Sequence, residues 1–382
     1  MNPVKVNVLG VSTTEFGELW KKSPRALAKQ AMMGALEDAG LKPTDIDALF
    51  VGNMLAGILG NQTNLGALFA EELDLPVPAV RVEGACASGG LALNSGVNSI
   101  LAGQYKTVLV LGVEKMTDSS QDEVITGLMA AGSDSERMAG ATFPGIYALM
   151  AQAYMEKYGI TEETLAAVSV KNHYHGSLND KAQFRKPITV EDVMNSGRIA
   201  DPLKLLDCSP ISDGASAVVI SSQVSKSKPV YITASEVATD TLALHDRKTF
   251  TSLTSVVKAS QAAYKKAGIS AADIDVAEIH DCFSIAEVIA VEDLGFSKRG
   301  EGARDIEKGK MTIGKGKIIT NSSGGLKACG HPVGATGVKQ IVEITQQLRN
   351  EAGLRQVKNA KIGLTHNVGG SGATAVIHIL QN

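Results

Sequence analysis

The chain has 382 residues, a net charge of −3, and 44% hydrophobic against 20% charged residues, as is typical of a globular protein with a large core. This charge provides no strong positive field, which argues against nucleic acid or an anionic membrane as a partner. No apolar run approaches the roughly 20 residues that span a bilayer, and the start MNPVKVNVLGVS lacks a signal-peptide pattern, so we expect a cytoplasmic protein.

Strands and helices are predicted to alternate along the chain, and the same order occurs twice. An apolar strand at 4–12 is followed by an amphipathic helix, a second strand, a Gly-rich turn with a helix, and a strand at 107–114. A second series of the same kind begins with a strand at 229–237 and includes a strand at 361–368. Alternation of this kind, with apolar strands, indicates an α/β protein with mostly parallel, buried sheets.

The two series also match in sequence, which indicates an internal duplication. Residues 35–53, ALEDAGLKPTDIDALFVGN, match residues 263–281, AYKKAGISAADIDVAEIHD, at a constant offset. Residues 213–221, DGASAVVIS, match residues 371–379, SGATAVIHI. We therefore predict two homologous halves, each with its own sheet.

The halves differ by a long insertion between the last two strands of the first half. This insertion is polar, mostly helical in pattern, and about 95 residues long, and such an insertion at a strand end commonly forms a cap or a binding loop. We predict three parts: an N-terminal half at 1–115 and 209–228, an inserted loop domain at 116–208, and a C-terminal half at 229–382.

Cys86 lies in the segment EGACASGG, between a strand-like run and a helix of small residues. A cysteine at a helix N-terminus meets the positive end of the helix dipole, which lowers the pKa of the thiol and favours the thiolate. An arbitrary cysteine is more often buried and inert. The strand–turn–helix context and the small neighbours instead predict a nucleophile here.

The segment EIHDCF places His280, Asp281 and Cys282 directly after a strand. The matching positions of the first half, near Gly52 and Asn53, carry no reactive side chain. The spacing of a zinc site is absent and the four cysteines form no CxxC pair, so we expect no metal. His280 and Cys282 are candidate catalytic groups, and we interpret Asp281 as an orienting or structural residue, because alternation directs it the other way.

Two further histidines lie in Gly-rich segments. His331 belongs to CGHPVGATG, where the start of a helix can present a side chain and N–H groups to an anion, and Cys329 is a reserve candidate for proton transfer. His366 ends an apolar strand in LTHNVGGSG, where N–H groups near Asn367 and Gly369 could form an oxyanion hole. A structural histidine bonded to a carbonyl is the alternative for His366.

The segments ACASGG, HDCF, CGHPVGATG and HNVGGSG, in this order on a duplicated chain, resemble the thiolase superfamily, and the resemblance covers essentially the whole sequence. His280–Phe283 stands where the common biosynthetic thiolases have Asn-Glu-Ala-Phe, and His366–Gly369 stands where they have Cys-x-Gly. Both departures resemble the sterol-carrier-protein-2-type thiolases. The segments FGELW, VGNMLAG, TFPGIYALMA, KNH, GGLKACGHPVGATG and LTHNVGGSG further resemble the archaeal-type acetyl-CoA acetyltransferases.

This resemblance implies a five-layered αβαβα thiolase fold, a dimer or dimer of dimers, and an insert that covers coenzyme A. It implies reversible condensation of two acetyl-CoA into acetoacetyl-CoA and free CoA, the first step of the mevalonate pathway. The CoA thioesters are substrates, and no cofactor is expected. It also implies a complex with 3-hydroxy-3-methylglutaryl-CoA synthase, bridged by a small protein with zinc and an OB fold.

The resemblance also implies roles for the candidate residues. Cys86 carries the acyl group, His331 takes its proton, and Cys282 replaces the missing base of the Cys-x-Gly motif. His280 and His331 are the predicted donors to the enolate oxygen, and the N–H groups of Cys86 and of a glycine near Gly369 are the predicted second oxyanion hole. Cys329 and His366 are alternatives for the base. Two other functions stay open: a decarboxylating β-ketoacyl synthase and a non-catalytic acyl-CoA-binding scaffold.

Overall fold

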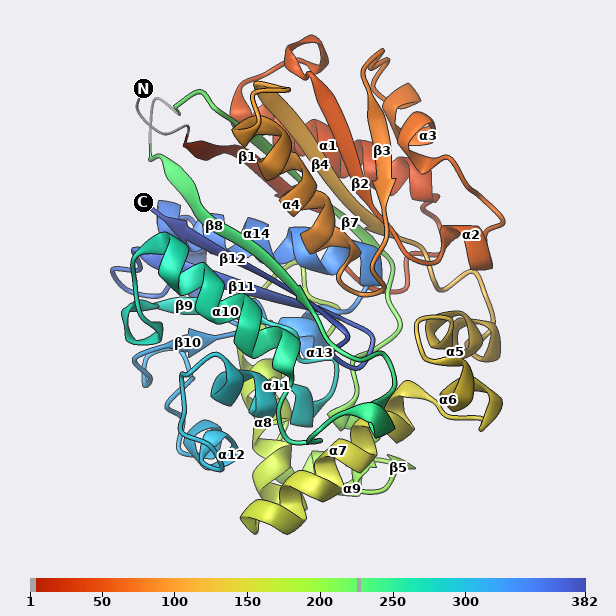
Figure 1. Ribbon diagram of the computed structural model, residues 1–382, viewed down its shortest axis with the longest axis vertical. Helices are drawn as coiled ribbons and strands as arrows, with labels where there is room; N and C mark the ends of the chain where they lie inside the picture. The colour runs from red at the N-terminus through yellow and green to blue at the C-terminus, as the bar shows by residue number, and fades with distance from the viewer. Residues whose placement is uncertain (1–4, 225–227) are drawn as a thin grey trace.

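The computed structural model in Figure 1 describes residues 5–224 and 228–382. Within these residues ten strands form one large sheet, in the order β10-β9-β11-β12-β8-β1-β7-β4-β2-β3. The first half of the chain contributes β1 (Val6–Thr13), β2 (Ala48–Gly52), β3 (Ala79–Val82), β4 (Thr107–Glu114) and β7 (Gly214–Ser221). The second half contributes β8 (Val230–Thr239), β9 (Val276–Ile279), β10 (Ile319–Thr320), β11 (Ile362–Gly369) and β12 (Thr374–Gln381).

Both halves have the same mixed topology. In the first half, β3, β2 and β4 are parallel neighbours, and β7 runs antiparallel to both β4 and β1. In the second half, β10, β9 and β11 are parallel neighbours, and β12 runs antiparallel to both β11 and β8. The predicted duplication of the fold is confirmed at the level of strand order and direction.

The prediction of two separate sheets is wrong in one respect, because the two halves are joined. Strands β1 and β8 are the inner edges of the halves, and they pair antiparallel between Val6–Val8 and Val230–Ile232. An unpaired strand edge leaves N–H and C=O groups without partners, and this short contact satisfies them.

Five layers result, as the resemblance predicts (Figure 1). Helices α4 (Ser88–Leu101) and α14 (Val333–Arg349) lie between the two halves of the sheet, since α4 packs on both β4 and β8 and α14 packs on both β4 and β11. The outer faces are covered by α1 (Pro24–Ala39) and α3 (Leu65–Glu71) on the first half and by α10 (Thr254–Ala267) on the second. None of the helices within the described ranges is long and apolar enough to cross a membrane.

The helix ends show why the sequence repeat is visible. Helix α1 ends at Gly40 with φ 65°, and α10 ends at the matching Gly268 with φ 69°. This left-handed conformation is open to glycine at little cost, so both Ala-Gly signals mark helix ends. A 3₁₀ turn follows each of them, η1 (Pro43–Asp45) and η4 (Ala271–Asp273), and leads into β2 and β9.

The chain between β4 and β7 forms a mostly helical unit. It contains α5 (Gln121–Met129), α6 (Asp134–Met138), α7 (Phe143–Tyr158), α8 (Glu162–Ser177) and α9 (Val190–Asn195), followed by the short strands β5 (Arg198–Ala200) and β6 (Leu203–Lys204). The predicted boundaries at 115/116 and 208/209 stay a prediction. The predicted first residues, 1–4, and residues 225–227 before the third part lie outside the described residues.

Candidate active site

A cavity of about 760 Å³ lies where the two halves meet the insert. Three of the predicted site residues, Cys86, Cys282 and His331, line it together. The insert contributes another part of the wall through Gln121, Phe143, Tyr147, Phe184 and Leu205. The volume falls in the range of ordinary ligand pockets, so a sizeable organic substrate can reach all three reactive side chains.

Cys86 lies in a sharp turn between β3 and α4. Ala85 before it has φ 54°, a left-handed conformation that is costly for a residue with a Cβ. Two hydrogen bonds hold the turn: Gly84 N–H donates to Ser88 Oγ at 3.0 Å, and Ser88 O–H donates to Ala85 O at 2.6 Å. The strained turn directs Cys86 into the cavity at the start of a helix, as predicted from the sequence.

The expectation of a lowered thiol pKa is wrong for Cys86. Burial raises the pKa of the Cys86 thiol to about 12, and the N–H of Gly370, which points at its sulfur, offsets only part of this effect. The helix N-terminus therefore does not outweigh the loss of water around the sulfur. In the free protein Cys86 is a thiol, and it needs a neighbouring base to become a nucleophile.

His331 can be this base, because its hydrogen bonds fix its tautomer. The Thr336 hydroxyl donates to Pro332 O at 3.1 Å, so its oxygen accepts the proton of His331 Nδ1 at 2.7 Å. Nε2 then carries a free lone pair. Burial lowers the pKa of His331 to about 3, which keeps the ring neutral, and Ser212 Oγ accepts the backbone N–H of His331 at 3.0 Å.

His280 has the opposite tautomer. The amide of Asn367 is oriented by two bonds: its Oδ1 accepts from Gly90 N–H at 3.1 Å and its Nδ2 donates to Cys86 O at 2.9 Å. The same Nδ2 lies 3.4 Å from His280 Nδ1, which must therefore accept. Nε2 of His280 carries the proton, is buried, and has no hydrogen-bond partner among the described residues. It is a donor available to an oxyanion.

Cys86, His280 and His331 lie close enough together to raise the question of a metal. One ligand atom of each lies within 4.8 Å of the other two, and a thiol with two imidazoles is a set that zinc accepts. A metal-bound histidine normally donates its second ring N–H to an acceptor. His331 does so, but His280 receives a hydrogen bond at that position. The bonding fits acid–base chemistry better than metal binding, and the absence of a metal stays a prediction.

His366 does not line the cavity with the other candidates. Its Nδ1 accepts the backbone N–H of His280 at 3.2 Å, and burial lowers its pKa to about 3. Asn367 likewise bonds to the backbone of Cys86 and Gly90 rather than facing the cavity. The geometry of both residues is that of supports for Cys86 and His280.

Gly370 rather than Gly369 provides the N–H next to Cys86. Gly369 has a different function in the packing, since a Cβ there would come within 2.4 Å of Gly84 O. The absence of a side chain at Gly369 lets β11 approach the Cys86 turn, and this approach places Gly370 beside the sulfur.

Cys282 lines the cavity, and burial raises its pKa well above the usual range. Its neighbour Asp281 points away, as expected, and accepts the N–H groups of Leu326 at 2.6 Å and Lys327 at 3.2 Å. These two N–H groups belong to α13 (Gly325–Cys329), which leads directly into His331. Asp281 therefore ties the HDCF segment to the histidine loop.

A second buried carboxylate connects the Gly-rich segments. Glu114, at the end of β4, accepts N–H groups from Met54 at 2.9 Å, Leu55 at 3.1 Å and Gly334 at 3.1 Å, and Asn53 Nδ2 donates to it at 2.7 Å. Burial raises its pKa to about 7. The N–H group at the start of α14, predicted to face a bound anion, is thus occupied by a carboxylate of the protein itself.

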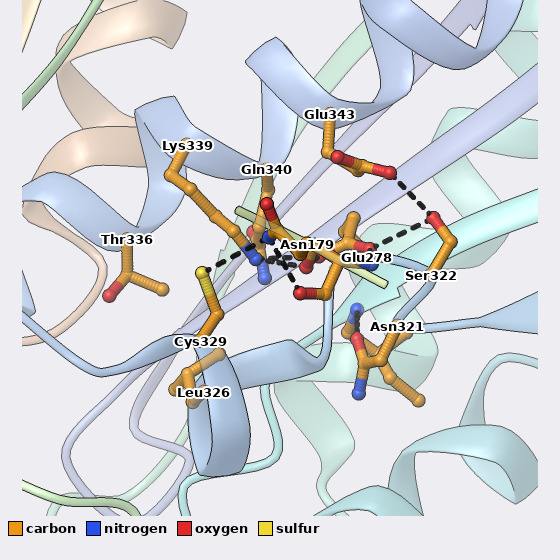
Figure 2. Close-up of polar contacts among 12 residues, drawn as sticks. Asn179, Glu278, Asn321, Ser322, Leu326, Cys329, Thr336, Lys339, Gln340 and Glu343 are labelled. Carbon is orange, nitrogen blue, oxygen red and sulfur yellow. Dashed lines mark hydrogen bonds and ion pairs between the residues drawn. The ribbon is translucent and has the colours of Figure 1, made fainter. Parts of the chain in front are cut away.

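Buried charges also support the strands behind the site (Figure 2). Lys339 on α14 donates to Glu278 Oε2 at 2.9 Å and to Ser323 Oγ, and Glu278 lies on β9 two residues before His280. Glu343, one turn further along α14, accepts from Ser322 Oγ at 3.0 Å. The cluster links α14, which follows His331, to the strand that carries His280.

Cys329 faces this cluster and not the main cavity. It lines a second cavity of about 570 Å³ together with Lys339 and Glu343, and Asn179 Nδ2 lies 3.7 Å from its sulfur. Burial raises the pKa of its thiol. Its position in the fold gives no support to its reserve role as a base for a substrate bound at Cys86.

Several residues at the site were not singled out from the sequence: Glu114, Tyr147, Cys208, Thr336 and Gly370. Thr336 lies in the GATG segment and Tyr147 in TFPGIYALMA, so both fall in motifs that the sequence pointed to. Their contacts depend on neighbours far away in the chain, such as Gly370 for Tyr147. No spacing rule reveals such contacts.

Comparisons with known proteins agree with these motifs. The profile "Thiolase, N-terminal domain" matches residues 6–224, and "Thiolase C-terminal domain-like" matches residues 236–382. The chain is 51% identical to an acetyl-CoA acetyltransferase of Methanothermobacter thermautotrophicus, over 98% of this chain and 99% of the relative. It is 35% identical to sterol carrier protein 2 of Homo sapiens, over 97% of this chain and 71% of that protein.

Among solved structures, the "Ltp2-ChsH2(DUF35) aldolase" superposes with a TM-score of 0.84 at 25% identity and covers 98% of both chains. The matches extend over both halves of the chain and include all four motifs. The chain belongs to the thiolase family of acyl-transferring enzymes.

Proposed function

We propose that this enzyme is an acetyl-CoA C-acetyltransferase, which condenses two acetyl-CoA into acetoacetyl-CoA and free CoA. The single observation that carries the proposal is the meeting of a buried thiol, two histidines of opposite tautomer and a second thiol at one cavity. The name and 51% identity of the Methanothermobacter relative support acetyl-CoA as the substrate. The insert, which forms part of the cavity wall, is proposed to cover coenzyme A.

In the first half-reaction, His331 Nε2 removes the proton from Cys86. The thiolate attacks the carbonyl carbon of acetyl-CoA, and the negative charge on the carbonyl oxygen is stabilised by the N–H groups of Cys86 and Gly370. When the C–S bond to CoA breaks, His331 returns the proton to the leaving thiolate. The product is an acetyl group on Cys86, and His331 is neutral again.

In the second half-reaction, Cys282 as thiolate removes a proton from the methyl group of a second acetyl-CoA. The enolate oxygen accepts a hydrogen bond from His280 Nε2–H, which the bonding of Asn367 supports as a donor. The enolate carbon attacks acetyl-Cys86, a C–C bond forms, and the C–S bond to Cys86 breaks. The proton on Cys282 then restores the Cys86 thiol. His331 donates to the enolate only when it holds a proton on Nε2, so it is the weaker of the two predicted donors.

We also propose the cellular setting that the sequence resemblance implies. The enzyme is a cytoplasmic homodimer or dimer of dimers that performs the first step of the mevalonate pathway. Its partners are 3-hydroxy-3-methylglutaryl-CoA synthase and a small bridging protein with zinc and an OB fold. The similarity to a chain whose structure title pairs it with a DUF35 protein supports a partner of this general kind.

A steady-state assay in both directions with acyl-CoAs of increasing chain length, with and without the synthase, tests the function. The proposal predicts acetoacetyl-CoA from acetyl-CoA alone and cleavage of acetoacetyl-CoA by free CoA. Product formation only when malonyl-CoA is supplied would favour the decarboxylating β-ketoacyl synthase, which makes its carbanion without a base. Absence of turnover with every thioester would favour the non-catalytic scaffold.

A further inference from the structure

Tyr147 is a fully buried side chain that the reaction as described does not use. It lies in the second turn of α7, on the insert, and lines the same cavity as Cys86 and Cys282. It is therefore a contact through which the insert reaches the reacting atoms.

Both parts of the Tyr147 side chain touch catalytic segments. Its ring stacks on Phe283, the residue after Cys282, with ring centroids 4.6 Å apart. Its hydroxyl donates to Gly370 O at 3.1 Å, on the residue whose N–H points at Cys86. These two contacts hold the hydroxyl beside the sulfur of Cys282, within hydrogen-bonding reach.

The surroundings of Cys282 do little else to stabilise a thiolate. Burial, Cys86 and Asp281 each raise its pKa, whereas Tyr147 and, to a smaller extent, Lys327 lower it. The ammonium group of Lys327 is committed to Asp207 O, and Asp281 is occupied by the N–H groups of α13. Tyr147 is thus a neutral donor next to a sulfur that must become an anion.

We propose that Tyr147 is a positioning residue for the proton-abstraction step and that its hydroxyl donates to Cys282 when Cys282 is a thiolate. A tyrosine has a single O–H to donate. In the resting enzyme this O–H serves Gly370 O, and a small rotation directs it to the anionic sulfur. This inference rests on the proposed role of Cys282 as base, and it assigns the insert a function beyond covering the substrate.

The variant Tyr147→Phe tests the proposal, because it removes the hydroxyl and keeps the ring that stacks on Phe283. Two rates are measured: the burst of CoA released when Cys86 is acetylated, and the exchange of acetyl-CoA methyl protons with deuterated water. A hydrogen bond to an ion is worth enough to slow exchange about 10- to 100-fold on its loss. The pH profile of exchange should move about one to two units upward, since Cys282 becomes harder to ionise. The burst should stay within about twofold of wild type, because acetylation of Cys86 does not require ionised Cys282.

Tyr154→Phe is the matched control. Tyr154 is a buried tyrosine on the same helix, and its hydroxyl donates to Glu292, away from the cavity. This control should change neither rate. Equal exchange rates and pH profiles in Tyr147→Phe and wild type would overturn the proposal, and so would a burst that falls by the same factor as exchange. A wild-type enzyme that exchanges no methyl protons would instead overturn the proposed function, and this inference with it.

Discussion

The hydrogen bond between His331 and Thr336 provides a sharp test of how Cys86 becomes a nucleophile. Thr336→Val keeps the shape of the side chain and removes the oxygen that accepts the proton of His331 Nδ1 at 2.7 Å. His331 is then free to place its proton on Nε2, where it cannot accept a proton from Cys86. Pro332 O loses one donor but keeps the N–H groups of Ala335 and Thr336.

The expected size of the effect follows from the burial of both residues. A buried N–H left without an acceptor costs about 1–3 kcal/mol, and the cost is toward the upper end when the ring becomes an imidazolium in the transition state. Since about 1.4 kcal/mol corresponds to a tenfold change in rate, acetylation of Cys86 should slow about 10- to 100-fold.

Single-turnover release of CoA measures this step without the condensation that follows. Thr336→Ser restores the hydroxyl and should recover most of the rate, which separates loss of the hydrogen bond from a packing defect. A Thr336→Val enzyme that acetylates Cys86 as fast as wild type would refute the tautomer argument. Equal losses in the Val and Ser variants would refute it as well.

Two further predictions concern the buried charges. Lys339→Met should destabilise the fold by about 3–5 kcal/mol, because it leaves Glu278 buried without its cation; urea unfolding measures this, and addition of Glu278→Gln to the same protein should recover part of the loss, whereas additive losses would contradict the pairing. Because the pKa of Cys86 is raised to about 12, its alkylation by iodoacetamide, followed by peptide mass, should rise about tenfold per pH unit from about pH 6 to about pH 10; a plateau at neutral pH would show a stable thiolate instead.

Much of the fold was predictable because its signals are local. The duplication is visible in the Ala-Gly helix ends and in the 3₁₀ turns that follow them, each of which depends on a few adjacent residues. The pairing of β1 with β8 was not predictable, because each strand reads as an ordinary apolar run. Only the three-dimensional arrangement shows that both edges lack another partner on that side.

The site shows the same division. Cys86, Cys282 and His331 were found from sequence because their motifs differ from the matching segments of the other half or lie at a helix start. Their ionisation was not, since the helix dipole acts locally on Cys86 whereas burial is set by the whole fold. The tautomers of His280 and His331 likewise depend on single hydrogen bonds from Asn367 and to Thr336.

The division of labour between the two cysteines is the central claim, and one measurement tests it directly. Cys282→Ala is incubated with acetyl-CoA while the intact protein mass and acetoacetyl-CoA are followed together. The claim predicts that an acetyl group accumulates on Cys86 and that no acetoacetyl-CoA forms. Condensation by this variant at near the wild-type rate would place the base elsewhere and contradict the claim.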